Sequence, residues 1–525
     1  MKELLGANTD TLDRIAESLR VDARRMQDIR TRAQRAVAEL QAGWNGPDLL
    51  HLTQQWEQQA SQQLASAATS LDTCGAELRA QSTAQRGVSS KDGGGWSYLP
   101  SWMEWMAPSV ALGIPLLPDP GGNTPTRPHP PTTPLVSPPK HVAPADNASW
   151  WRSLSPQLQE QVITEHPDWI GNRDGVPFTA RDEANRALLS VHRARLVAER
   201  QRLEPDLAAN RFGGAFTDDD AALTQVGEVA ALRQVKDKLA SLDAIEQTLA
   251  RNGERQLLLL DMSPERAQAA IARGNVDSAD NVAVFVPGMT TNVTDYMKGY
   301  DKDMDQLQHR AELENKRANP TQDSTTATVT WIGYQAPQLG WDLLGENSAA
   351  GYQAAEAGAA QLVPFLQGIG AARDHDAHLS VLGHSYGSTT AGLAFRQNTG
   401  VDDAVFFGSP GIGTSHVDDL LVPKGHSHYI EARWDPVGDL GRFGIDPSHM
   451  DGIVHASAKE STVVDPATGE TRHFKEVTGH SSYLVDDSTS QYNISVVVAG
   501  VPERRVSDRG VGAGDVLSWP FPGTF

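Results

Sequence analysis

Residues 379–388 read Leu-Ser-Val-Leu-Gly-His-Ser-Tyr-Gly-Ser, a strand-like run that leads into Gly-x-Ser-x-Gly and then into a helical segment beginning at Ser388. A turn this sharp between a strand and a helix holds the central serine in a strained backbone conformation, and glycines two positions before and after it relieve the crowding. The N-terminus of the helix favours negative charge that develops beside the serine. We therefore predict that Ser385 is a nucleophile; the alternative is an ordinary glycine-rich turn.

Apolar runs typical of buried strands alternate with helical segments around this turn. We expect strands at 256–260, 282–286, 327–332, 379–382, 404–407 and 428–432, and helices at 264–273, 347–373 and 388–397. Buried strands that alternate with helices indicate a mainly parallel α/β sheet with helices on both of its faces.

The acid of a serine–histidine–acid triad is expected after the nucleophile, where a later strand ends. The expected strand 428–432 leads to Asp435, which a proline follows. Asp439 lies close enough to be the alternative acid, and either aspartate could instead be a simple turn residue. We predict Asp435.

The base is expected later still. Residues 471–477 have the pattern of a last strand, and His480 lies in the loop beyond it. His449 and His455 also follow the acid, but neither comes after a terminal strand. A carboxylate fixes the tautomer of an imidazole, so that the other ring nitrogen can take the serine proton. We therefore predict His480 as the base.

An oxyanion hole needs two backbone N–H donors near the serine. The first is expected at Tyr386, directly after the nucleophile. The second is expected in the loop after the apolar strand 282–286, from Met289 or its neighbour Thr290, where Gly288 permits a close approach. The alternative is a plain turn at the end of the strand.

Composition excludes several other classes of function. The chain has 525 residues and a formal net charge of −21, which disfavours binding to nucleic acid or to anionic lipid. Cys74 is the only cysteine, so no intrachain disulfide can form. The sequence has no metal-ligand cluster, phosphate-binding loop or dinucleotide fingerprint, so we expect no cofactor. The most apolar stretch, 96–118, is broken by prolines and Glu104, so we expect no transmembrane segment.

The sequence divides into five regions. We predict a helical hairpin over 1–86, a Pro/Gly-rich linker over 87–148, a helical region over 149–253, the catalytic domain over 254–500 and a tail over 501–525. The hairpin has two apolar stripes at helical spacing, joined by a turn that contains Trp44, Asn45 and Gly46. Two such stripes pack against each other as antiparallel helices, and a generic coiled-coil module is the alternative.

The hairpin resembles the Trp-x-Gly family associated with bacterial type VII secretion. The resemblance implies a homodimer or a small helical partner bound through residues 1–86. It also implies export by a route that needs no Sec signal peptide, and the first 20 residues contain no such peptide. The export signal usual in that family, Tyr-x-x-x-Asp/Glu after the second helix, does not directly follow Leu78. Cytoplasmic retention is the alternative.

The rest of the chain resembles an actinobacterial α/β-hydrolase family long known only as a domain of unknown function. Matching blocks lie at 170–177, 184–186, 284–291, 383–387 and 408–411, together with Arg181. The resemblance implies that the helical region packs on the hydrolase domain. Arg181, Asp182 and Arg186 would dock this region through ion pairs or, alternatively, contact a substrate gate.

The residues thus predict a metal-free serine hydrolase that acts on small-molecule or lipid esters. Four aromatic residues are candidates for an apolar acyl site, or alternatively for simple core packing: Trp331, Tyr334, Trp341 and Trp434. A different hypothesis is a secretion-dependent effector or interaction protein, in which the hairpin binds a helical partner.

Overall fold

The structure is a computed structural model that describes residues 137–212, 219–338, 349–435, 437, 443–465 and 468–508, with isolated positions between 17 and 83. The chain separates into two compact units, Met1–Arg127 and Pro128–Phe525. Several residues that the sequence singled out lie outside the described residues: Trp44, Asn45, Gly46, Cys74, Trp341, Asp439, the linker up to 136 and the tail from 509. In the described part, no helix is both long and apolar enough to cross a bilayer.

The first unit is described at isolated helical positions. Arg20 contacts Asp72 at 3.4 Å, and Arg30 Nε donates to Ser61 Oγ at 2.9 Å. Residue 20 thus contacts residue 72, and residue 30 contacts residue 61, so the residue numbers of the two segments run in opposite directions. Antiparallel helices give this order. A hairpin over 1–86, its partner and its export stay predictions.

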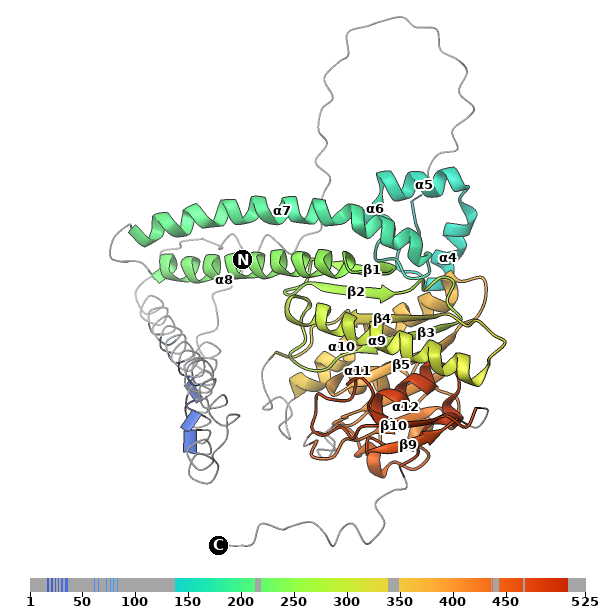
Figure 1. Ribbon diagram of the computed structural model, residues 1–525. Helices are drawn as coiled ribbons and strands as arrows, with labels where there is room; N and C mark the ends of the chain where they lie inside the picture. Colours follow the sequence, from blue (N-terminus) through green and yellow to red (C-terminus); the bar gives the residue numbers. More distant parts are fainter. Residues whose placement is uncertain are drawn as a thin grey trace, which may run out of the picture. The chain divides into compact units, whose positions relative to one another are not determined.

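The second unit is built on a mainly parallel sheet (Figure 1). Its strand order is β1-β2-β4-β3-β5-β6-β7-β8. The strands are β1 (Arg255–Asp261), β2 (Gln268–Arg273), β3 (Asn281–Val286), β4 (Thr326–Ile332), β5 (His378–His384), β6 (Asp403–Phe407), β7 (Ser427–Ile430) and β8 (Val454–Ala456). Strands β3 to β8 pair in parallel, whereas β2 pairs antiparallel with both β1 and β4. The carboxyl ends of the parallel strands therefore meet at one edge.

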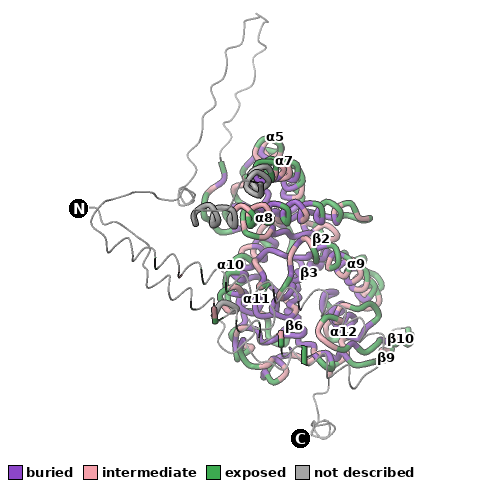
Figure 2. Tube along the Cα trace, turned by 90° about the vertical axis from the view of Figure 1, so that its left-hand side faces the viewer, coloured by how far each residue is buried: buried purple, intermediate pink, exposed green. Residues whose placement is uncertain are grey.

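Helices cover both faces of this sheet, as expected. Figure 2 shows the buried strands between α10 and α11 on one side and α9 and α12 on the other. These helices are α9 (Val293–Ala318), α10 (Ala349–Ala372), α11 (Tyr386–Ala394) and α12 (Thr489–Val498). The two faces carry separate apolar clusters, because alternate residues of a strand point to opposite sides. Val381 and Leu382 of β5, for example, belong to different clusters.

The helical region packs on the β1 side of the sheet (Figure 1). It comprises α4 (Pro144–Ser153), α5 (Pro156–Glu165), α6 (Pro167–Ile170), α7 (Phe178–Phe212) and α8 (Asp219–Leu249). Asp182 on α7 accepts a 2.6 Å hydrogen bond from the Leu257 amide of β1. Arg181 is fully buried and pairs with Asp174 at 2.9 Å. The Arg181–Asp174 pair therefore lies within the helical region, whereas Asp182 and Arg186, which donates to the Arg255 carbonyl of β1 at 2.7 Å, dock this region on the sheet.

Three predictions about secondary structure were wrong or incomplete. Residues 268–273, expected in a helix, form β2, because ladders to β1 and β4 outweigh the helix propensity of its alanines. The strand expected near the C-terminus is β10 (Thr471–Phe474). It pairs with β9 (Ser461–Val464) in a separate two-stranded sheet, so it does not extend the main one. Helix α4 begins at Pro144, inside the segment expected to be linker.

Short 3₁₀ turns occupy Val417–Asp419, Pro447–His449 and Pro502–Arg504.

Candidate active site

Ser385 occupies the sharp turn between β5 and α11. Its backbone angles are φ 55° and ψ −131°, a strained conformation for a residue with a side chain. A side chain at Gly387 would place its Cβ 2.1 Å from the Val286 carbonyl oxygen, and one at Gly383 would lie 2.7 Å from Ser388 Cα. Both glycines are thus required sterically, and the turn has the predicted form.

The structure brings Ser385, His480 and Asp435 together. Ser385 Oγ lies 2.7 Å from His480 Nε2, and His480 Nδ1 lies 3.0 Å from each carboxylate oxygen of Asp435. Ser385 is 8 % exposed, and the Asp435 side chain is fully buried. The serine hydroxyl can therefore pass its proton to an imidazole that a buried carboxylate orients.

A short backbone ladder joins the loop of the acid to the loop of the histidine. Arg433, which lies beyond the end of β7, forms a parallel bridge with Thr478, and the Gly479 amide donates to the Arg433 carbonyl at 2.9 Å. Between this ladder and the acid, Trp434 has a φ of 64°. The ladder holds Asp435 and His480 side by side although they are 45 residues apart in the chain.

Hydrogen bonds set the ionisation state of the acid. Burial by itself would raise the pKa of Asp435, but hydrogen bonds from His480, Tyr483 and the Val437 amide outweigh it and hold this pKa below its ordinary value. Asp435 is therefore ionised at neutral pH, as an orienting carboxylate must be.

A second imidazole lies against the first. His384 Nε2 lies 2.8 Å from the His480 carbonyl oxygen, and the two ring centroids are 4.8 Å apart. Burial, and then the neighbouring His480, lower the pKa of His384 to about 4. His384 is therefore neutral at neutral pH, so its ring nitrogen can donate to that carbonyl group.

Comparisons with known proteins show which proteins this chain resembles. Residues 263–445 match the sequence profile of a family described as alpha/beta hydrolase, a range that includes Ser385 and Asp435. An uncharacterized protein of Mycobacterium tuberculosis is 33% identical over 242 residues, which cover 45% of this chain and 88% of that protein. The chain belongs to the alpha/beta hydrolase family.

Two further likenesses were found. A second uncharacterized protein of Mycobacterium tuberculosis is 30% identical to this hydrolase over 335 residues, 62% of this chain and 48% of that protein. Among solved structures, a cold-adapted esterase from an Arctic intertidal metagenomic library aligns with a TM-score of 0.29 at 12% identity. That alignment covers 49% of this chain and 96% of the esterase.

The loop after β3 passes close to Ser385. A Cβ atom at Gly288 would lie 2.6 Å from Ser385 Cβ and 3.0 Å from its Oγ, so the loop backbone passes directly beside the serine. The Thr290 amide donates to the Pro337 carbonyl oxygen at 2.7 Å and is therefore already used. The structure gives the Met289 amide no acceptor among the described residues, which distinguishes the two candidate donors.

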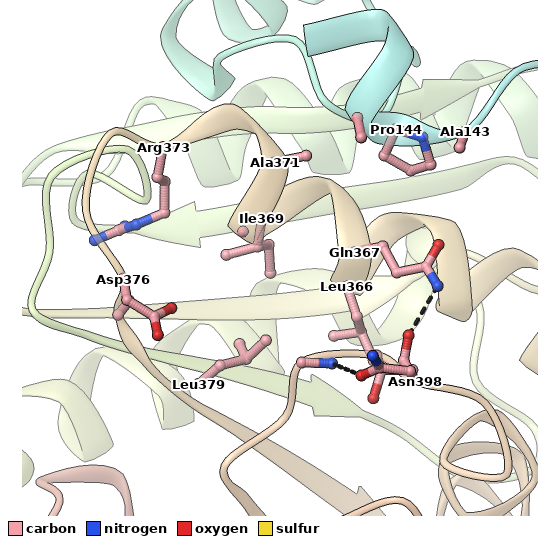
Figure 3. Close-up of a pocket in the computed structure, with 15 residues that line it drawn as sticks. Ala143, Pro144, Leu366, Gln367, Ile369, Ala371, Arg373, Asp376, Leu379 and Asn398 are labelled. Carbon is pink, nitrogen blue, oxygen red and sulfur yellow. Dashed lines mark hydrogen bonds between the residues drawn. The ribbon is translucent and has the colours of Figure 1, made fainter. Parts of the chain in front are cut away.

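The aromatic residues proposed for an acyl site have different environments. Trp331 and Tyr334 are 1 % and 3 % exposed and pack in the core of the hydrolase, whereas Trp434 is 63 % exposed beside the acid. A surface pocket of about 440 Å³ lies elsewhere, where Leu366, Gln367 and Pro144 approach one another (Figure 3). It also contacts Leu379 at the start of β5, whereas Ser385 follows the end of that strand.

Three residues of the site were not singled out by the sequence reasoning. Tyr483 donates to Asp435, His384 lies against His480, and Gly408 adopts a φ of 56° beneath them. Each had a signal in the sequence: Tyr483 shares the loop of His480, His384 directly precedes Ser385, and Gly408 directly follows β6, the strand next to β5. Gly408 belongs to the 408–411 block, which the resemblance alone had marked.

Proposed function

We propose that this hydrolase cleaves carboxylic esters through a Ser385–His480–Asp435 triad. The observation that carries the proposal is the continuous chain of contacts from the Ser385 hydroxyl through both nitrogens of His480 to a buried carboxylate, built on a strained elbow. A hydroxyl group is a weak nucleophile until an adjacent base accepts its proton.

The reaction divides into two steps. As Ser385 Oγ attacks the ester carbonyl carbon, His480 Nε2 takes the serine proton and Asp435 stabilises the resulting imidazolium. His480 then donates that proton to the departing alcohol, leaving an acyl-enzyme. In the second step, water loses a proton to His480 and attacks the acyl carbon, and the proton returns to Ser385 as the acid product leaves.

Backbone amides stabilise the negative charge on the carbonyl oxygen. We assign this role to the N–H groups of Tyr386 and Met289, because Tyr386 begins α11 and the loop of Met289 passes beside the serine. Thr290 is the weaker candidate because its amide is bonded to Pro337. Such a donor contributes about 2.7–4 kcal/mol to transition-state stabilisation. Esters are preferred over amides as substrates because an alkoxide leaving group demands less of the general acid.

A fluorophosphonate probe tests the nucleophile. Wild type should be labelled and Ser385→Ala should not, whereas Ser263→Ala, which removes an exposed serine hydroxyl bonded to Asp261, should be labelled like wild type. With a short p-nitrophenyl ester, Ser385→Ala and His480→Ala should each lower kcat by roughly 10⁴-fold or more. Labelling that persists in Ser385→Ala would refute the assignment of Ser385 as the nucleophile. Turnover that survives His480→Ala would refute the assignment of His480 as the base. Equal turnover of the matched p-nitroanilide would refute the ester preference.

A further inference from the structure

Tyr483 links the acid to the end of β7. It lies three residues after His480 in the same loop and is 1 % exposed. Its hydroxyl is 2.6 Å from Asp435 Oδ2, and the Ala432 amide donates to that hydroxyl oxygen at 2.9 Å. The phenol is thus held between a backbone group and the carboxylate.

Chemistry fixes the direction of both hydrogen bonds. An amide N–H can only donate, so the Tyr483 oxygen accepts from Ala432 and its own hydrogen points at Asp435. Burial, and then the nearby Asp435 charge, raise the pKa of Tyr483 above its ordinary value. The phenol therefore keeps this hydrogen throughout the range in which an imidazole titrates.

The Asp435 carboxylate has one fixed donor on each oxygen besides His480. The Val437 amide donates to Oδ1 at 2.9 Å, and Tyr483 donates to Oδ2 at 2.6 Å. His480 Nδ1 lies 3.0 Å from both oxygens, midway between them. Among the described residues, Tyr483 is the one donor other than His480 that holds Oδ2.

Gly408 shows how tightly these groups pack. A Cβ atom at this position would lie 2.8 Å from Asp435 Oδ2, 2.9 Å from a ring carbon of Tyr483 and 3.1 Å from His480 Nδ1. Three side chains thus converge over one backbone position, which leaves no room there for a side chain larger than that of glycine.

We propose that Tyr483 is a positioning residue of the triad, which fixes the plane of the Asp435 carboxylate and withdraws part of its charge from His480. This inference rests on the proposed function. A hydrogen bond to a carboxylate reduces the charge that its other partners meet. Without the phenol hydroxyl, Asp435 would attract the imidazole proton more strongly and would orient the ring less well.

Tyr483→Phe tests this proposal, because it removes the hydroxyl group and keeps the ring. We expect kcat for a p-nitrophenyl ester to fall roughly tenfold, with KM within about twofold, since the lost bond acts on the base and not on substrate binding. The acid limb of kcat/KM should move to higher pH by about half a unit, because a carboxylate without the phenol donor stabilises a positive charge beside it more strongly. Among the described residues, the other ionisable groups that face this network are His384, Glu431 and Tyr429, and all of them stay in place.

Tyr492→Phe is the matched control. Tyr492 is also 1 % exposed, belongs to the same apolar cluster, and donates its hydroxyl to the Arg504 carbonyl at 2.9 Å. It should lose comparable stability and keep the wild-type pH profile. A Tyr483→Phe enzyme with wild-type kcat and a superimposable profile would refute the proposal, as would the same shift in Tyr492→Phe.

A second measurement tests the proposal if the Tyr483→Phe variant does not fold. Replacing Tyr483 with 3-fluorotyrosine makes the phenol a stronger donor, so the acid limb should move to lower pH; no movement, or movement to higher pH, would contradict the proposal. The rate of fluorophosphonate labelling gives the same profile without a substrate. Undiminished labelling of Ser385→Ala would defeat the proposed function itself, whereas loss of labelling there with an unmoved Tyr483→Phe profile would defeat this inference alone.

Discussion

The two ends of the parallel strands each carry a histidine–aspartate cluster, and the clusters differ in what the imidazoles contact. At the carboxyl end, His480 joins one carboxylate to a serine hydroxyl. At the amino end, three imidazoles all contact the buried Asp403: His378 at 2.8 Å, His426 at 3.0 Å and His428 at 2.7 Å. The second cluster has more histidines, yet the strained serine, our proposed nucleophile, lies at the first.

The difference shows that a short histidine–carboxylate distance does not make an active site. At the carboxyl end, the backbone of Ser385 is strained. The N-terminus of α11 and the backbone of the loop after β3 both lie beside its hydroxyl group. At the amino end, one ring nitrogen of each of the three histidines points at the buried Asp403 carboxylate. We therefore expect this cluster to stabilise the strands that begin there. Within the described residues, no group of three or more His, Cys, Asp or Glu side chains could hold a metal ion.

Gly408→Ala should disturb the catalytic cluster most. A methyl group there would meet Asp435, Tyr483 and His480 together, at a φ of 56° that alanine disfavours. Displacing the acid and the base by a few tenths of an ångström should lower kcat/KM roughly 100-fold. Steady-state hydrolysis of a p-nitrophenyl ester measures the effect.

Gly400→Ala separates crowding from backbone strain. Gly400 has a φ of 73°, but no atom lies within 4 Å of the position that its Cβ would take. Gly400→Ala should lose about 1 kcal/mol of stability from backbone strain alone, and Gly408→Ala should lose more, because crowding adds to the strain. Gly400→Ala should keep wild-type kcat/KM, and an equal loss of activity in both would rule out a steric role for Gly408.

The sequence was sufficient for the parts of the fold that local pattern determines. The Gly-x-Ser-x-Gly turn, the buried strands around it and the alternation with helices follow from residue types at fixed spacings, and the structure confirms them for β3 to β7. The positions of Asp435 and His480 were predicted from chain order, and the structure places His480 between Asp435 and Ser385.

Features that depend on distant pairing could not be predicted in the same way. The alanine-rich strand β2 has a helical local preference and becomes a strand because it has a neighbour on each side. Tyr483 and Gly408 are ordinary residues in the sequence, and their contacts with Asp435 arise when two loops meet. The choice between Met289 and Thr290 likewise depends on Pro337, 47 residues further along the chain.

Asp403→Asn should show that the other cluster acts on stability. Hydrogen bonds from His378 and His428, working against burial, hold the pKa of Asp403 well below its ordinary value, so its stabilisation is lost only in strong acid. The same contacts with Asp403 outweigh burial and raise the pKa of His378, so its stabilisation is complete below about pH 6.5 and is lost as the pH rises through the raised value.

Both contributions are therefore complete between about pH 4 and 6.5. The loss in free energy of unfolding in Asp403→Asn should be about 2–3 kcal/mol in this window and smaller at higher pH. Urea unfolding at several pH values measures it, and kcat should stay at the wild-type value. A loss that grows as the pH rises above 6.5 would contradict this assignment.

The smallest expected effect uses His384, whose titration should oppose that of His378. Its folded-state pKa of about 4 lies below the ordinary value of 6.5, so the unfolded chain binds more protons between these values and acid destabilises the fold. In His384→Gln, an amide can still donate to the His480 carbonyl but does not titrate. The loss in free energy of unfolding on going from pH 6.5 to pH 4.5 should therefore be smaller in the variant than in wild type, by about 2 kcal/mol. Urea unfolding of the two proteins at both pH values tests this, and identical pH dependence would mean that His384 is not kept neutral by burial. With the expected result, the histidines at the two ends of β5 respond to acid in opposite directions, because His378 faces a carboxylate and His384 faces a carbonyl group.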